Sequence, residues 1–266
     1  MSQRLVFLKL GGSLITDKNQ AHTARLDILE RLAFEIAAAR GQDQDLKIVL
    51  GHGSGSFGHY PASKYKTRQG VRTAEEWTGF IDVWREAVGL NRLVLEALER
   101  ASLPAIAFPP SALVTALRGS VSTWNLDTIR CALSENLLPV IYGDVAFDSA
   151  LGGTILSTED LFTHLAHHIQ PTQLLLAGIE PGVWADFPDN THLLPEITSF
   201  SLREYETSLR GSAALDVTGG MADKVRQILS LVNEFPGITA AIFSGERPGN
   251  VRRALLGESM GTVIHS

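Results

Sequence analysis

The sequence lacks several features that would assign it to a common class of protein. It has 266 residues and one cysteine, Cys131, which excludes a disulfide framework and a cysteine-ligated metal cluster. It contains no low-complexity tract, and no apolar run reaches the roughly 18–20 residues that span a bilayer. The apolar run 5–10 is interrupted by Lys9 and followed by two glycines, so it is too short for a signal peptide. These absences predict a cytoplasmic globular protein.

Positive charge is also scarce. The chain has 23 Lys and Arg residues against 29 Asp and Glu residues, a formal net charge of −6. An acidic protein repels polyanions, so we expect neither nucleic acid nor a membrane surface as a partner. Only six of the basic residues are lysines, and each is a compact point charge suited to a phosphate. The lysines are Lys9, Lys18, Lys47, Lys64, Lys66 and Lys224.

Short apolar runs alternate with amphipathic segments along the whole chain. Several runs are too continuously apolar for a one-faced sheet, which predicts parallel strands covered on both sides. The fold class is therefore α/β, a three-layer αβα sandwich with a mostly parallel central sheet. The predicted strands are 5–10, 47–50, 105–108, 139–142, 173–177, 239–243 and 262–265, with a local hairpin of 145–148 and 152–156.

Three amphipathic segments predict long helices between these strands. One runs from Leu26 to a C-cap at Gly41. A longer one begins with a capping box formed by Thr73 and Glu76. A third covers 221–235.

Glycine clusters follow several predicted strands. They lie at 11–12, at 51–58 and at Gly143, and a further cluster at 219–220 begins a late helix. Backbone N–H groups in such turns can approach an anion closely, and a helix N-terminus adds a favourable dipole. Any single cluster is better explained as a tight turn. Their combination with lysines indicates phosphate binding.

Two lysines occupy positions where a cation needs an anionic partner. Lys9 lies inside an apolar run, where an ammonium group is unfavourable unless it is paired or points into a site. The alternative is an edge-strand lysine that reaches water. Lys224 lies in the first helical turn, where it opposes the helix dipole. Lys47 precedes a strand and is expected to be ordinary surface.

The interval 46–74 contains no Asp or Glu, although it contains Lys64, Lys66 and His59. This local positive region surrounds the second glycine cluster and is suited to a small phosphate or carboxylate. The same cluster matches a dinucleotide-binding pattern of three glycines. The polar segment after it, with Pro61, predicts no helix there, so we reject the dinucleotide interpretation.

Together these motifs resemble the amino acid kinase superfamily over essentially the whole chain. The segments that carry the resemblance are 9–13 with Lys18, 142–145, and 216–224. The segment 52–59 resembles the corresponding loop of the isopentenyl phosphate kinases, and fosfomycin kinases are similar there and form the competing interpretation. A non-catalytic nucleotide- or anion-binding protein on the same fold is a third possibility.

The resemblance implies ATP- and Mg²⁺-dependent phosphorylation of isopentenyl phosphate in a homodimer of single-domain chains. Residues up to about 150 would bind the acceptor and residues 151–266 would bind ATP, with no protein-built metal site. The catalytic residues it implies are Lys9, Lys18, His59, Asp144 and Lys224, with Asp144 orienting the lysines. The ATP-binding residues it implies are Lys9, Gly11, Gly12, Ser13, Lys18, Gly178, Gly182, Gly219, Gly220 and Lys224. The acceptor-binding residues it implies are Gly53, Ser54, Gly55, Gly58, His59 and Thr158.

The chain departs from the family pattern in two segments. The segment 178–184 lacks the acids and the threonine usual there, which affects the adenine and ribose contacts. Residues 157–160 replace a more usual Ser-Gly-Asp, so that Glu159 or Asp160 would substitute for the acid. An isoprenoid tail would need an apolar slot, for which the candidates are Trp77, Phe80, Ile81 and Trp84. The alternative is that these side chains are helix core.

Overall fold

The computed structural model describes residues 4–201 and 220–266. The helices in this part are α1 (Gly12–Ile15), α2 (Leu26–Gln42), α3 (Gly55–Tyr65), η1 (Thr67–Gln69), α4 (Ala74–Arg100), α5 (Pro110–Leu113), α6 (Asp127–Ser134), α7 (Thr158–Ile169), α9 (Gly220–Glu234) and α10 (Asn250–Leu255). None of the helices described is long and apolar enough to cross a membrane.

The strands form one large and two small sheets. The large sheet has the order β12-β14-β13-β9-β1-β2-β6-β3. Its strands are β12 (Glu196–Ile197), β14 (Thr262–Ile264), β13 (Thr239–Ser244), β9 (Gln173–Gly178), β1 (Arg4–Leu10), β2 (Leu46–His52), β6 (Leu138–Tyr142) and β3 (Ala105–Ala107). From β13 to β3 every neighbouring pair is parallel, and β14 runs antiparallel to β13. The prediction of a mostly parallel central sheet is therefore confirmed.

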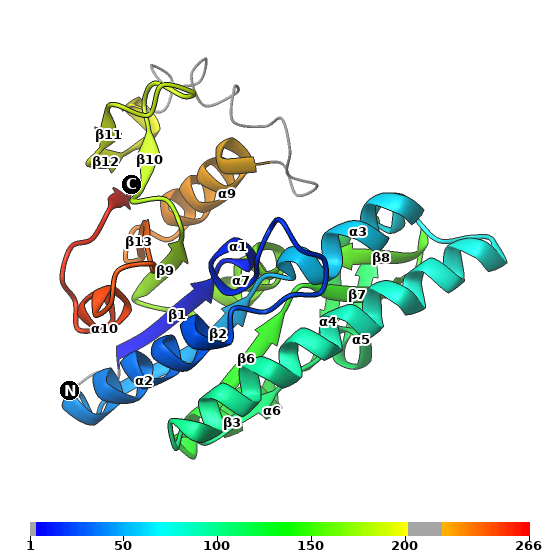
Figure 1. Cartoon of the computed structure of the whole chain (residues 1–266), viewed down its shortest axis with the longest axis horizontal. Coiled ribbons are helices and arrows are strands. Elements are labelled where there is room, and N and C mark those ends of the chain that lie inside the picture. The colour runs from blue at the N-terminus through cyan, green and yellow to red at the C-terminus, as the bar shows by residue number, and fades with distance from the viewer. Residues whose placement is uncertain (1–3, 202–219) are drawn as a thin grey trace.

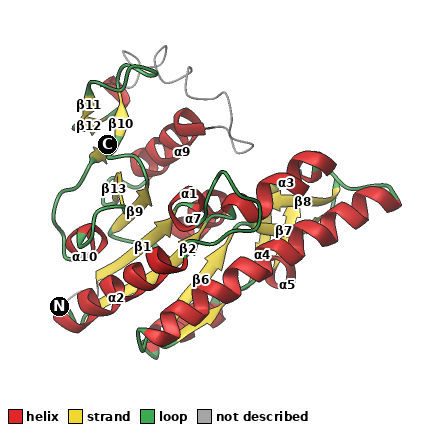
Figure 2. Cartoon of the chain, in the orientation of Figure 1, coloured by secondary structure: helices red, strands yellow, loops and turns green. Residues whose placement is uncertain are grey.

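Helices cover both faces of the large sheet. On one face, α2, α4 and α10 enclose a core that includes Leu8, Ile36 and Val94. On the other face, α6, α7 and α9 enclose a core that includes Phe7, Phe162 and Val225. Adjacent residues of β1, Phe7 and Leu8, thus point into opposite cores, as a strand buried on both sides requires. Figure 1 shows α2 and α4 lying side by side across one face, and Figure 2 shows the strands behind them. The three-layer αβα sandwich is confirmed.

The small sheets lie at either end of the large one (Figure 1). A four-stranded sheet has the order β5-β4-β7-β8. Its strands are β4 (Val114–Leu117), β5 (Ser120–Trp124), β7 (Asp144–Asp148) and β8 (Gly152–Leu156). The antiparallel pair β7–β8 is the predicted hairpin. A two-stranded sheet joins β10 (Val183–Trp184) to β11 (Leu193–Leu194).

Seven predicted strands are found, and all seven lie in the large sheet. The capping box at Thr73 and Glu76 is also confirmed. Two local predictions are wrong. Helix α2 continues through Gly41 to Gln42, with Asp43 as its C-cap residue. A helix, α3, follows the second glycine cluster and continues past Pro61, its seventh residue.

The N-terminus of α10 is held by a buried carboxylate from α2. Glu35 is 8% exposed, and its two carboxylate oxygens accept hydrogen bonds from the backbone N–H groups of Gly249, Val251 and Arg252. Arg31 forms an ion pair with the same carboxylate at 2.6 Å. Glu35 therefore satisfies backbone donors that α10 cannot satisfy itself, and it fixes α10 against the sheet.

Replacing Glu35 with alanine should leave these N–H groups unpaired in a buried place. We expect Glu35→Ala to lower the free energy of unfolding by about 3 kcal/mol, measured by chemical denaturation. The exposed Glu30 on the same helix provides the control, and Glu30→Ala should change stability by less than about 0.5 kcal/mol. Equal effects of the two substitutions would contradict the anchoring role of Glu35.

Candidate active site

The carboxyl ends of four adjacent strands bring the predicted motifs to one edge of the large sheet. β9, β1, β2 and β6 are parallel neighbours, and they end at Gly178, Leu10, His52 and Tyr142. Ligands of open α/β sheets bind at this edge, where loops from several strands meet. The glycine turns after β1 and β2, the segment at Asp144 and the start of β10 therefore surround one region.

The two glycine turns touch each other through their backbones. A Cβ atom on Gly12 would lie 2.3 Å from the backbone nitrogen of Gly55, and one on Gly53 would lie 2.9 Å from the nitrogen of Gly12. Gly55 has a φ of +49° and leaves no room beside Thr16. Thr16 completes the junction, because its Oγ1 donates to the Gly12 carbonyl and accepts from the Ser56 N–H. Only glycine permits this approach.

Lys9 forms a buried ion pair with Glu159, the second residue of α7. The two residues are 8% and 9% exposed. Burial alone would raise the pKa of Glu159, but the positive charges of Lys9 and Lys224 outweigh it and lower that pKa. Glu159 is therefore an anion between two of the predicted catalytic lysines. Of the two acids considered at 157–160, it is the one that contacts Lys9.

Asp160 has a different role from Glu159. It completes a capping box with Ser157 at the start of α7, and it pairs with Arg68 at 3.1 Å. Asp160 of α7 thus neutralises the charge of Arg68, which lies in the acid-free interval 46–74. Within the same interval, the Lys64 ammonium lies 4.5 Å from the ring centre of Tyr65.

Asp144 is fully buried at the start of β7. Burial raises its pKa to about 6, although the backbone N–H groups of Ser111 and Val145 donate to its carboxylate. These bonds direct Asp144 toward α5 and its own strand. The ion pair of Lys9 involves Glu159, and the orienting role of Asp144 stays a prediction.

A buried polar array supports the second glycine turn from beneath. His52 is 1% exposed, its ring stacks on Tyr142, and its nitrogens contact Gly53 O and Asn91 Oδ1, each at 3.2 Å. Burial lowers the pKa of His52, so the ring is neutral and one nitrogen accepts a hydrogen bond. Asn91 donates this hydrogen bond when its side-chain amide is rotated by 180°, so that Nδ2 rather than Oδ1 faces Nε2 of His52. The array was missed in the sequence analysis, although an asparagine on the apolar face of α4 signals a buried partner.

The predicted acceptor-binding residues lie around the start of α3. Ser54 is its N-cap residue, and Gly55, Gly58 and His59 lie within the helix. The hydroxyl of Thr158 donates to the His52 carbonyl at 2.6 Å, which joins α7 to the acceptor loop. The N-terminus of α3 thus lies beside the turn that follows β1. Two of its N–H groups are already bonded, that of Ser56 to Thr16 Oγ1 and that of Phe57 to the Ser54 carbonyl, so an anion there would bind the N–H groups that precede them.

The predicted ATP-binding residues lie on the other side of this junction. Ser13 is in α1 and Lys18 is exposed on the following turn. Gly178 ends β9, and a Cβ atom there would meet open space, whereas Gly182 packs against Thr262. Gly220 begins α9 with a φ of +69°. Gly219 lies outside the described residues.

Comparison with known proteins supports a kinase identity for this site. The model of the Amino acid kinase family matches residues 4–244. A protein named isopentenyl phosphate kinase from Methanocaldococcus jannaschii is 34% identical, with 98% of each chain covered. Another of that name, from Methanothermobacter thermautotrophicus, is 35% identical, again with 98% of each chain covered.

A solved structure described as isopentenyl phosphate kinase has the same architecture. It superimposes with a TM-score of 0.83 and 32% identity, covering 98% of this chain and 100% of the other. The matched family model, the full-length relatives and the shared fold agree with the lysine and glycine motifs at the sheet edge. The chain belongs to the amino acid kinase family.

Proposed function

We propose that the protein transfers the terminal phosphoryl group of ATP to isopentenyl phosphate, forming isopentenyl diphosphate and ADP. The contact between the turn after β1 and the turn after β2 carries this proposal. Each turn presents backbone N–H groups, so two phosphates bound by adjacent turns would be neighbours. That geometry suits a transfer between two phosphates, and it agrees with the names of the full-length relatives.

The lysines supply the charge that this transfer requires. Two anionic substrates repel each other, and the transition state carries negative charge on the oxygens of the transferring group. Lys9 pairs with Glu159, and Lys224 is close enough to lower the pKa of the same carboxylate, so two positive charges are held near one buried acid. A phosphate monoester has a second pKa near ~6, so it is already a nucleophile at pH 7 and needs no general base.

Mg²⁺ would be held mainly by the phosphates of ATP. The residues that the structure describes include no group of three or more His, Cys, Asp or Glu side chains able to hold a metal ion. Nucleotide-bound Mg²⁺ normally needs only one or two carboxylates and keeps several waters, so the lysine-rich site is compatible with it. When bound, the ion would neutralise charge on the phosphates. Lys9, Lys18 and Lys224 would bind the same phosphates from the protein side.

An apolar cluster beside Asp144 suits a short hydrocarbon tail. Val145 follows Asp144 and forms a core cluster with Val71, Phe80 and Val83. The ring of Phe80 lies 5.0 Å from Trp77, its partner in this cluster. The other two candidates for the slot, Ile81 and Trp84, are 44% and 40% exposed, so they face away from this core.

The order of strands in the large sheet suggests which part of the chain binds each substrate. β2, β6 and β3 come from residues 46–142, and they lie on one side of β1. β9, β13, β14 and β12 come from the second half and lie on the other side. We assign the acceptor to the first side and ATP to the second. We also propose a cytoplasmic homodimer, as the family resemblance implies.

A turnover assay across acceptors tests the proposed function. ADP release with Mg·ATP should be fastest with isopentenyl phosphate, compared with dimethylallyl phosphate, fosfomycin, UMP, carbamate and acetylglutamate. We expect this preference because the isopentenyl group would pack against the apolar cluster, and its phosphate would bind at the glycine turn adjacent to that of ATP. No turnover of isopentenyl phosphate, together with rapid turnover of another acceptor, would overturn the assignment.

Glu159→Gln tests the buried acid between the lysines. Without the carboxylate the lysines lose their common anchor, and we expect kcat to fall about 10²- to 10³-fold. The KM for ATP should not rise, because no positive charge is lost. Glu159→Asp restores the acid usual in the family and should recover most of the rate, while the exposed Glu30→Gln should have no effect. A kcat unchanged in Glu159→Gln would refute the role.

His59→Ala tests the acceptor side of the junction. We expect the KM for isopentenyl phosphate to rise about 10- to 100-fold through loss of a charge-assisted hydrogen bond. The affinity for ATP, measured by titration, should stay nearly unchanged. His59→Asn retains an N–H donor and should recover part of the loss, and His168→Ala on the exposed face of α7 serves as the control. If ATP affinity collapsed instead, the division of the site would be wrong.

A further inference from the structure

The segment between α1 and α2 folds back on itself as a tight loop, residues 16–24, and carries Lys18. Thr16 pairs with Ala24 in an antiparallel bridge, and the Asp17 N–H donates to the Thr23 carbonyl at 2.9 Å. Lys18 follows Asp17 directly and is exposed. Because the outgoing and returning arms of the loop 16–24 are hydrogen-bonded, a contact that holds the returning arm also holds Lys18.

The returning arm of the loop 16–24 is fixed to the first turn of α3. Ser56 Oγ accepts from the Thr23 N–H and donates to the Thr23 carbonyl, each at 3.4 Å, and the Ser56 N–H donates to Thr16 Oγ1 at 3.0 Å. The ring of His22 meets that of Phe57 edge-on, with 6.1 Å between the ring centres. Figure 1 shows the chain between α1 and α2 passing beside α3. The loop that carries a predicted ATP-binding lysine is thus bonded to the helix that carries the predicted acceptor residues.

His22 also joins this loop to α4. Its Nδ1 lies 2.6 Å from Oε2 of Glu86, and the two side chains are 50% and 24% exposed. A carboxylate can only accept a hydrogen bond, so Nδ1 carries the proton and donates. The His22–Glu86 contact therefore fixes the loop 16–24 to a second helix, 64 residues further along the chain.

The backbone of His22 is held in a conformation that its side chain disfavours. Its φ is +55°, in the left-handed region, where a residue with a Cβ atom is less stable than glycine. Such a conformation persists where the surrounding contacts stabilise it. For His22 those contacts are with Phe57 and Glu86.

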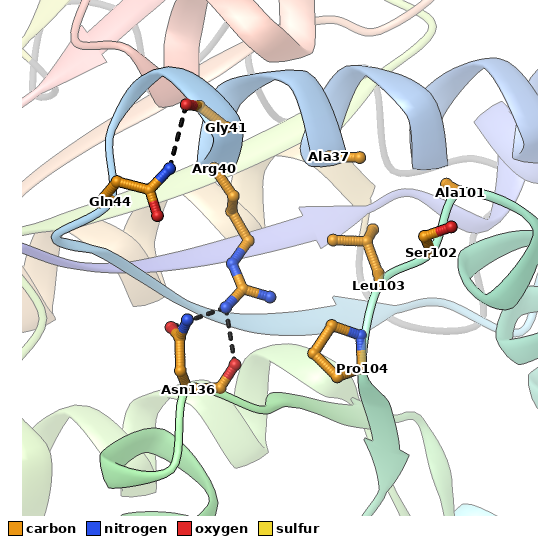
Figure 3. Close-up of a pocket in the computed structure, with 9 residues that line it drawn as sticks. All are labelled: Ala37, Arg40, Gly41, Gln44, Ala101, Ser102, Leu103, Pro104 and Asn136. Atoms are coloured by element: carbon orange, nitrogen blue, oxygen red, sulfur yellow. Dashed lines mark hydrogen bonds between the residues drawn. The ribbon is translucent and has the colours of Figure 1, made fainter.

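A polar contact at the other end of the strands differs in its surroundings. Figure 3 shows Arg40 of α2 reaching Asn136, to which it donates at 2.7 Å through the backbone oxygen and Oδ1. Asn136 lies just before β6 begins, whereas the predicted site residues follow the carboxyl ends of the strands. The Arg40 contact joins two parts of the fold, and the His22 contact lies beside the site.

We propose that His22 and Glu86 are positioning residues, which hold the loop 16–24 against α3 and α4 and thereby direct Lys18 toward the phosphates of ATP. This inference rests on the proposed function, in which Lys18 binds those phosphates. Glu86 acts on ATP only through His22 and Lys18, so its effect on ATP affinity must depend on Lys18.

Calorimetric titration with ATP, without an acceptor, tests the positioning role. Glu86→Ala should weaken ATP binding about fivefold, because a partly exposed ion pair contributes up to about that factor. His22→Ala should do the same. His22→Asn should retain most of the affinity, because asparagine places an N–H donor near the position of Nδ1 and tolerates a positive φ. Glu75→Ala, an exposed acid in the first turn of the same helix, should match the wild type.

The dependence on Lys18 separates positioning from a general loss of structure. In a Lys18→Ala background, the further change Glu86→Ala should leave ATP affinity unchanged. A fivefold loss in that background would overturn the proposal, and so would wild-type affinity in folded Glu86→Ala. Absence of ATP binding to the wild-type protein would overturn the proposed function as well. ATP binding without turnover of isopentenyl phosphate would contradict the acceptor assignment alone, because the titration contains no acceptor.

Discussion

The constraint on which the rest of the site depends is the backbone contact between the turn after β1 and the turn after β2. A side chain on Gly12, Gly53 or Gly55 would collide with the facing backbone, so the two turns are in direct backbone contact. Because β1 and β2 are parallel and Leu10 pairs with His52, the two turns begin at the same level of the sheet. Thr16 then joins them by hydrogen bonds. The adjacency of the two turns is thus a property of the backbone, and under the proposed function it places the two phosphates side by side.

Buried charge at the junction is balanced locally. Lys9 is among the least exposed charged residues described, and its partner Glu159 is equally buried. A buried pair of this kind contributes little net stability, because desolvation of two ions offsets their attraction. Its value lies in geometry. Glu159, in α7, holds Lys9 of β1, and its charge also acts on Lys224 of the neighbouring helix α9.

Apolar periodicity made the sheet and its covering helices predictable, because strands buried on both faces leave a strong signal in sequence. The partner of Lys9 was not predictable from spacing, since Glu159 is 150 residues away and Asp160 beside it was an equal candidate. Arg68 lies in the acid-free interval 46–74, and its partner Asp160 could not be predicted because it comes from a helix far along the chain. Pro61 and the polar residues around it suggested that no helix follows the second glycine cluster, yet α3 continues past this proline.

The position of β1 at the middle of the large sheet has a consequence for synthesis of the chain. Its partner β2 emerges soon after it, but its other partner, β9, begins at Gln173. Until then one edge of a mostly apolar strand has no neighbour, and such an edge is a template for pairing with other chains. The nascent protein therefore passes through a long interval in which β1 needs protection. The strand that closes this edge, β9, also ends at Gly178, one of the residues predicted to bind ATP, so pairing of both edges of β1 and delivery of this glycine to the site occur together.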